Sequence, residues 1–290
     1  MDQSEDRAAP PSQASGENAE SKTQSQKIWS SLINDLTARK PEWQEEVEAI
    51  SVDNIRQQRD DGHAFSDSAV FEALVLALLS SDIDWSRVRS VIGNLKTVFC
   101  SYDVRTFVEC NLNDLSRIHQ TLKDWKIASQ NTRRMLGYLH ETIAGLERQA
   151  HRYGGMDHYL SSLYAAHGKS PERLALALGI PGDAKLKGFG VPLAAEALRN
   201  LGYDLAKPDR HIMRAFGMWG LVEFPNWDPG NKTAPSANAR QLLDTMMAVK
   251  AFAKDLRRSV SLTDTTIWYA CARTPGHRSL SNAELARFLG

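Results

Sequence analysis

Apolar residues recur at helical spacing along nearly the whole chain from Ile28 onward. In one example, four apolar residues between Met135 and Leu146 are separated by four, four and three positions, which places them on one face of a helix. No convincing stretch alternates polar and apolar residues for more than four positions, so strands are not predicted. A chain with this pattern buries helix against helix, and we predict an all-α fold.

The chain is long enough for one large domain or two small ones. It has 290 residues, of which 42% are hydrophobic and 24% charged, an ordinary mixture for a globular protein. The longest apolar runs, such as 73–79, are too short to cross a bilayer, and residues 1–25 lack the apolar stretch of a signal peptide. We therefore expect a protein that makes no contact with a membrane.

Basic and acidic residues balance, with 35 of each, which excludes binding to a polyanion by bulk charge alone. Residues 1–25 are rich in small and polar residues and hold five acids and two bases, so they are predicted to be a disordered tail. Residues 26–290 then hold 33 bases and 30 acids. This mildly basic balance permits a local nucleic-acid site without arguing for one.

The three cysteines, Cys100, Cys110 and Cys271, fit neither the spacing of a zinc site nor that of an iron–sulfur cluster. We interpret them as reduced thiols in the core of a cytosolic protein, because disulfides are rare in that compartment. A redox or metal-binding role is the alternative interpretation.

A Gly-x-Gly hairpin, Gly188-Phe189-Gly190, leads directly into a predicted helix at residues 192–201. Two glycines allow a close backbone approach, and the N–H groups at the start of the following helix have no partner within it. Such a site favours an anion, of which a phosphate is the natural example. A turn that serves only the packing of two helices is the alternative.

An acidic residue lies 19 positions after Gly190, in the sequence Pro208-Asp209-Arg210-His211 that opens another amphipathic helix. Together, the hairpin, the helix and this aspartate resemble the signature of the helix-hairpin-helix superfamily of DNA glycosylases. The segment 198–203 is similar to the branch of that superfamily that acts on oxidised guanine.

Two upstream segments add to the resemblance. Residues 71–88 are similar to the first barrel helix of the family and the turn that follows it, and Asn131-Thr132-Arg133-Arg134 is similar to a family turn after the wedge loop. The motifs occur in the family's order over residues 71–214. The resemblance implies an all-α, two-lobed fold with a six-helix barrel.

The expected domains follow from this resemblance. Residues 66–185 would form the barrel, and residues 26–65 and 186–290 would form a second helical lobe that carries the hairpin and the aspartate. The tail, 1–25, would precede both. The active site would lie in the cleft between the lobes, with Asp209 at its rim.

The resemblance also implies which residues hold DNA. Backbone N–H groups of the hairpin and the next helix would bind a phosphate, and small polar side chains of the preceding loop would fill the gap left by a flipped base, although such residues also suit any turn. The residues expected to contact DNA are Lys187, Gly188, Gly190, Leu193, His211, Arg214, Gln130 and Asn131. The carbonyl groups of Ala184, Leu186 and Phe189 could hold a structural monovalent cation, and no other cofactor is expected.

Asp209 is the expected catalytic residue, because a carboxylate stabilises the positive charge that develops on the sugar when a base departs. Capping the helix that begins at Arg210 is a second role that it can fill at the same time. Pro192 stands where strand-cleaving family members carry a lysine that attacks the sugar, so no lyase activity is expected.

Three residues are candidates to line the pocket for the flipped base. Asp82 stands in place of the family's usual glutamine, and Trp85 and Trp125 are candidates for stacking on a flipped base, although a tryptophan in the core is the alternative. The chain lacks the cysteine set of the iron–sulfur branches, and Leu76 stands where adenine-mismatch glycosylases carry a glutamate.

We therefore predict a monofunctional DNA glycosylase that removes a damaged or modified base from double-stranded DNA. A non-catalytic protein that binds DNA or senses lesions through the same hairpin is the alternative. The protein is expected to be a monomer in the cytoplasm, associated with the nucleoid, or in the nucleus if the source is eukaryotic.

Overall fold

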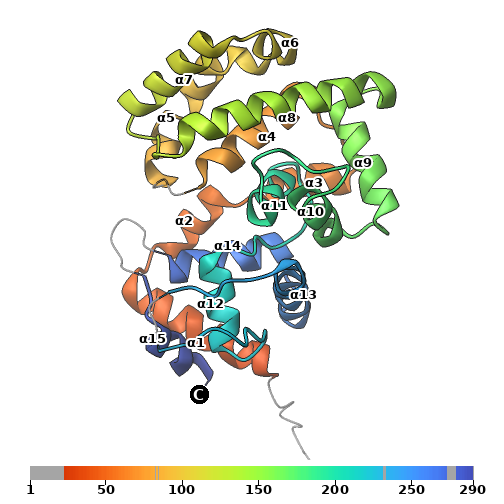
Figure 1. Cartoon of the computed structure of the whole chain (residues 1–290). Coiled ribbons are helices and arrows are strands. Elements are labelled where there is room, and N and C mark those ends of the chain that lie inside the picture. The colour runs from red at the N-terminus through yellow and green to blue at the C-terminus, as the bar shows by residue number, and fades with distance from the viewer. Residues whose placement is uncertain (1–22, 82, 84, 231–232, 273–278, 290) are drawn as a thin grey trace, which may run out of the picture.

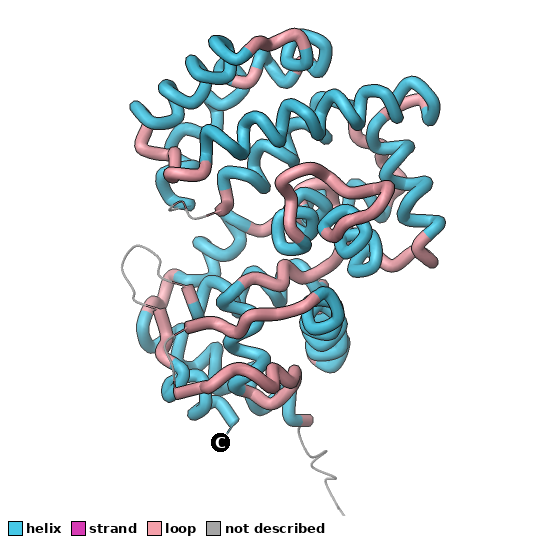
Figure 2. Tube along the Cα trace, viewed as in Figure 1, coloured by secondary structure: helices cyan, strands magenta, loops and turns pink. Residues whose placement is uncertain are grey.

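A computed structural model describes residues 23–81, 83, 85–230, 233–272 and 279–289 of the chain (Figure 1). These residues form helices joined by loops, and none of them lies in a strand (Figure 2). The all-α prediction is confirmed for the described part of the chain. Within it, no helix combines the length and the apolar character needed to cross a membrane.

Two lobes are visible in Figure 1, one above the other. The upper lobe contains α3 (Asp53–Asp60), α4 (Asp67–Leu79), α5 (Trp85–Val98), α6 (Val104–Val108), α7 (Leu112–Asp124), α8 (Thr132–Tyr153), α9 (Met156–Ala166), α10 (Pro171–Gly179) and α11 (Val191–Arg199). The lower lobe contains α1 (Gln24–Arg39), α12 (Arg210–Met218), α13 (Ala239–Asp255), α14 (Val260–Cys271) and α15 (Asn282–Ala286), with α2 (Trp43–Ile50) rising from it toward the upper lobe. Short 3-10 turns follow α5 and α15, at Cys100–Tyr102 and Arg287–Leu289.

Each lobe has its own buried core. The first core runs from Val70 to Leu205 and includes Met246 of α13, whereas the second joins Ile28–Val47 to residues between Ala206 and Phe288. The sequence predicts a division at residues 185 and 186, but the hairpin helix α11 packs against α4 and α10 of the first core. The cores therefore divide in the loop just before Asp209.

Helix α4 is the centre of the first core. Eight of its thirteen residues are buried, and it contacts α8, α9 and α11. The aromatic ring of Phe71 packs against those of Phe99 and Phe107, with ring centroids 6.4 and 4.6 Å apart. An apolar helix that is surrounded by other helices gains most of its stability from this burial.

Several helices begin or end at residues that favour a helix terminus. Ser170 caps α10 by accepting a hydrogen bond from the Arg173 N–H group, and Pro171 occupies the first turn. Gly202 follows the end of α11 with a φ of +79°, a conformation that favours glycine. A Cβ atom at Gly202 would lie 2.5 Å from the carbonyl oxygen of Ile55 in α3, so this site also needs glycine for space.

The two helices that flank the hairpin pack unusually closely. A Cβ atom added to Gly179, the last residue of α10, would lie 2.5 Å from the Cα atom of Val191, the first residue of α11. The backbone of α11 therefore starts in direct contact with the end of α10. This contact sets where the hairpin leaves one helix and enters the next.

We expect Gly179→Ala to lower the free energy of unfolding by about 1–3 kcal/mol, because the new methyl group would meet backbone atoms that cannot move independently. Gly137→Ala in α8 is the matched control. Its Cβ atom would meet nothing within 4 Å, so the higher helix propensity of alanine should stabilise the protein by about 0.5–1 kcal/mol. Urea denaturation of both variants measures the two changes, and equal effects would contradict the close-packing argument.

Candidate functional site

The hairpin between α10 and α11 is held by backbone hydrogen bonds. The N–H group of Leu186 donates to the carbonyl of Leu178 at 3.0 Å, and that of Phe189 donates to the carbonyl of Leu186 at 3.1 Å. Gly188 has a φ of +78°, and a Cβ atom there would lie 2.6 Å from the side chain of Tyr138 in α8. Gly188 is therefore required by the fold itself.

Gly190 is different from Gly188. It is exposed, its φ of −78° suits any residue, and a Cβ atom would lie 3.7 Å from the ring of Pro192. No described residue accepts a hydrogen bond from the N–H group of Gly190 or of Gly188. The hairpin thus presents two unused donors beside the start of α11, which is the arrangement that binds an anion.

A lysine lies beneath the hairpin. The ammonium group of Lys185 donates to the carbonyl of Gly179 at 2.7 Å and to the carbonyl of Phe189. Burial of the Lys185 side chain lowers its pKa. Phe189 is one of the three carbonyls that the sequence predicts for a structural cation, and in the structure it contacts this ammonium group. Among the described residues, no group of three or more acidic, histidine or cysteine side chains could hold a metal ion.

The other hairpin lysine points elsewhere. The ammonium group of Lys187 pairs with the carboxylate of Glu141 and lies 5.6 Å from the ring centroid of Tyr138, both on α8. Its carbonyl accepts a hydrogen bond from the hydroxyl of Thr142 at 3.1 Å. Lys187 is thus exposed on the hairpin surface, where its contact with DNA stays a prediction.

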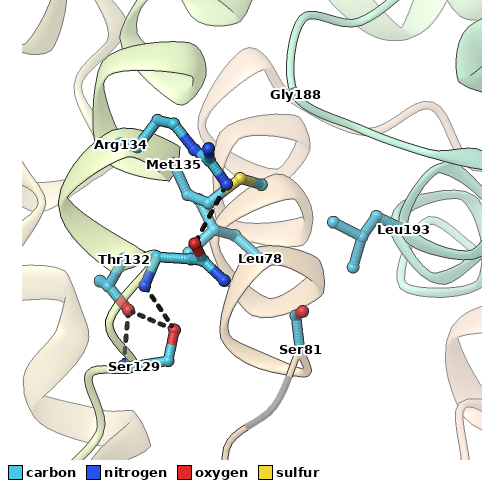
Figure 3. A pocket seen from close by; sticks show the side chains of 9 residues that line it. Leu78, Ser81, Ser129, Thr132, Arg134, Met135, Gly188 and Leu193 are labelled. Carbon is cyan, nitrogen blue, oxygen red and sulfur yellow. Dashed lines mark hydrogen bonds between the residues drawn. The ribbon is translucent and has the colours of Figure 1, made fainter.

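A pocket of about 150 Å³ lies where the hairpin, the C-terminal end of α4 and the N-terminal end of α8 meet (Figure 3). Leu193 of α11 faces Met135 and Ser81 across it. The residues that line it are Leu78, Ser81, Ser129, Asn131, Thr132, Arg134, Met135, Gly188 and Leu193. The structure therefore brings three predicted DNA contacts, Asn131, Gly188 and Leu193, to one cavity.

The loop before α8 is ordered by its own side chains. The hydroxyl of Thr132 accepts from the Ser129 N–H group at 2.8 Å, and the hydroxyl of Ser129 accepts from the Asn131 N–H group at 3.2 Å. The Asn131 side chain in turn accepts from the guanidinium of Arg134 at 3.0 Å. Gln130 is exposed in this loop, and its entry into a base stack stays a prediction.

The tryptophans that are expected to stack on a flipped base lie outside the pocket. Trp85 and Trp125 are half-buried and pack against the first core, and neither lines the cavity. Asp82 lies outside the described residues. Met135 lines the cavity but is not predicted as a site residue, because its spacing in the sequence indicates only an apolar helix face.

Asp209 is the N-cap of α12. One of its carboxylate oxygens, Oδ1, accepts hydrogen bonds from the N–H groups of His211 and Ile212 at 2.8 and 3.1 Å. No described residue donates a hydrogen bond to its second oxygen, and the residue is half-buried. The capping role is confirmed. It also fixes the carboxylate at the end of a helix, with one oxygen available for another partner.

Two residues of α12 that are expected to contact DNA face inward in part. The ring centroid of His211 lies 6.4 Å from that of Trp268, and burial lowers the pKa of this histidine. The guanidinium of Arg214 donates to the carbonyl of Leu280 in the lower lobe. Arg214 therefore ties α12 to the segment before α15, and its contact with DNA stays a prediction.

A buried group of charged side chains lies behind Asp209. The carboxylate of Asp264 in α14 is 1% exposed and lies 2.8 Å from the guanidinium of Arg199, the last residue of α11. Arg199 also contacts Glu196 at 3.3 Å, and Glu196 lies 3.7 Å from the ammonium of Lys207. We call these four residues, Glu196, Arg199, Lys207 and Asp264, the buried charge cluster.

The cluster holds the loop that carries Asp209. The N–H group of Lys207 donates to Asp264 at 3.1 Å, and the ammonium of Lys207 donates to the hydroxyl of Ser80 at the end of α4 at 3.0 Å. The carboxylate of Asp204 accepts from the N–H groups of Val260 and Ser261 at 3.1 and 2.8 Å. These hydrogen bonds and ion pairs join the loop to α14 in the lower lobe and to α4 and α11 in the upper lobe.

The protonation of Asp264 should influence stability. Burial, together with the nearby carboxylates of Asp209 and Glu196, raises its pKa from 3.8 to about 7, although Arg199 opposes the shift. Because the folded state binds this proton more tightly than the unfolded state, the stabilisation is fully present below pH 4 and is lost as pH rises through 7.

We expect the free energy of unfolding of the wild type, relative to Asp264→Asn, to fall between pH 4 and pH 7 by at most about 4 kcal/mol. Asparagine keeps the shape of the side chain and does not titrate. Urea denaturation of both proteins at four pH values across this window measures the difference. A difference that does not change with pH would show that Asp264 stays ionised in the folded protein.

The fold of the chain is similar to that of the 8-oxoguanine DNA glycosylase of Thermotoga maritima. The TM-score is 0.54, and the alignment covers 87% of this chain and 100% of that chain. The sequences are 17% identical, so the likeness concerns the fold. No family model matches the chain, and no curated protein matches it in sequence. The chain thus shares an all-α fold with that glycosylase, and the fold class that its motifs predict is confirmed.

Proposed function

We propose that the protein is a monofunctional DNA glycosylase that hydrolyses the bond between the sugar and a damaged or modified base in double-stranded DNA. The observation that carries this proposal is Asp209: its Oδ1 atom caps α12, its other oxygen has no donor among the described residues, and it follows an anion-binding hairpin in a chain with a glycosylase fold. The protein acts as a monomer, without a required cofactor, in the compartment that holds the DNA.

The reaction needs the target nucleotide outside the duplex, because the bond to be broken is covered when the base is stacked. The free N–H groups of Gly188 and Gly190 bind a backbone phosphate without reading the sequence. Gln130 and Asn131 lie on the loop between α7 and α8 and fill the place that the base leaves. Asn131 and Gly188 line one pocket, so the phosphate-binding hairpin and the loop that fills the base stack contact the same stretch of DNA.

Asp209 then acts on the exposed sugar. Departure of the base leaves an oxocarbenium-like sugar, and an ionised carboxylate stabilises it and directs a water molecule to the first carbon. The two N–H donors from α12 hold the Asp209 carboxylate in one orientation. The oxygen without a donor is the one that faces the reaction.

We expect Asp209→Asn to reduce base release by at least about 100-fold while DNA affinity changes less than about threefold, because the amide keeps the shape and removes the charge. Glu223→Gln, which removes an exposed carboxylate after α12, is the control and should keep full activity. The assay incubates each protein with a panel of lesion-bearing duplexes and cleaves abasic sites with hot alkali.

Base release by Asp209→Asn at the wild-type rate would contradict the catalytic assignment. Tight DNA binding by the wild type without release from any duplex of the panel would favour the alternative, a non-catalytic protein that binds or senses lesions.

We further expect no strand cleavage without alkali, and no protein–DNA adduct after borohydride treatment. A Schiff base needs a primary amine at the sugar, and Pro192 offers none at the start of α11. The ammonium groups of Lys185 and Lys187 are held by carbonyl groups and by Glu141. A trapped adduct would contradict this proposal, and peptide mapping would then test Lys207, which lies two residues before Asp209.

A further inference from the structure

Lys185 contacts the peptide group between Phe189 and Gly190, whose N–H group is part of the proposed anion site. Its ammonium group donates to the carbonyl of Phe189, and the N–H group of that same peptide belongs to Gly190. No peptide bond among the described residues is cis, so the carbonyl and the N–H group of this unit point in opposite directions. The ammonium group therefore lies on the inner side of the peptide, and the unused N–H group of Gly190 points away from it.

A second contact keeps the ammonium group in place. Lys185 also donates to the carbonyl of Gly179 at 2.7 Å, which belongs to the last residue of α10. That residue packs directly against Val191 at the start of α11. The side chain thus joins the end of one helix to the hairpin just before the next, and its charge is partly removed from water.

A charged donor on a carbonyl has an electrostatic effect beyond its own bond. Hydrogen bonds in a chain polarise one another, so a peptide whose oxygen accepts from an ammonium group donates more strongly through its N–H group. The effect is greater where the local dielectric constant is low. Lys187 has no such contact, because its ammonium group pairs with Glu141 on the outside of the hairpin.

We propose that Lys185 is a positioning residue for DNA binding, which orients and polarises the peptide between Phe189 and Gly190 so that the Gly190 N–H group binds a backbone phosphate. The inference rests on the proposed function for the identity of its ligand. Lys185 itself touches no DNA, and it supplies from within the chain the positive charge that the hairpin carbonyls would otherwise take from a bound cation.

The test measures the affinity for an undamaged duplex by fluorescence anisotropy, at one ionic strength, in potassium and in tetramethylammonium salts. Lys185→Ala should bind at least about tenfold more weakly in tetramethylammonium than the wild type does. Lys254→Ala removes the same charge from an exposed position on α13 and should bind within about twofold of the wild type. Circular dichroism shows whether each variant is folded.

Rescue separates polarisation from a structural role. Potassium ions coordinate backbone carbonyl groups, so potassium should restore much of the affinity of Lys185→Ala and leave that of the wild type unchanged. Lys185→Arg, which keeps a charged donor, should bind more tightly than Lys185→Ala in either salt.

The outcomes separate this inference from the proposed function. Equal affinity of the wild type and Lys185→Ala, or a loss that neither potassium nor arginine relieves, would overturn the role of Lys185 and leave the glycosylase proposal intact. If the wild type bound no duplex in either salt, the proposed function and this inference would both fail.

Discussion

The hydrogen bond from the Lys207 N–H group to Asp264, together with the two that Asp204 accepts at the start of α14, determines where the loop that carries Asp209 lies. The two buried cores meet at this loop, since Leu205 belongs to the first core and Ala206 to the second. Apolar packing alone does not fix how two cores are placed relative to each other, because the hydrophobic effect is not directional. Hydrogen bonds to and from α14 are directional, and the position of Asp209 relative to the hairpin depends on them.

Much of this architecture could be predicted from the sequence. The helical spacing of apolar residues predicts the all-α fold. The setting of Asp209 predicts a capped helix, and this cap is present. The glycines of the hairpin point to an anion site, which stays a prediction, and the N–H groups of Gly188 and Gly190 have no acceptor among the described residues. The predictions of the fold class and of the cap succeed because each depends on a local pattern that a few neighbouring residues specify.

The remaining features depend on contacts between distant segments. Asp264 lies 55 positions after Asp209 in the sequence, and nothing near it indicates that it holds the loop before that residue. The spacing of Met135 identifies a helix face but not a cavity, which exists only where three segments meet. Lys185 and Lys187 look alike in the sequence, and only the path of the hairpin directs one inward and the other outward.

The two hairpin glycines are kept for different reasons, which bears on how such a chain can diverge. The space beside Tyr138 and the positive φ require glycine at residue 188 in any chain that folds this way. Nothing in the fold requires glycine at residue 190, where only an approaching ligand would meet a side chain. In a related chain whose hairpin no longer bound a ligand, Gly188 would be kept and Gly190 could be replaced by other residues. The residue at position 190 therefore indicates whether the hairpin still binds a ligand.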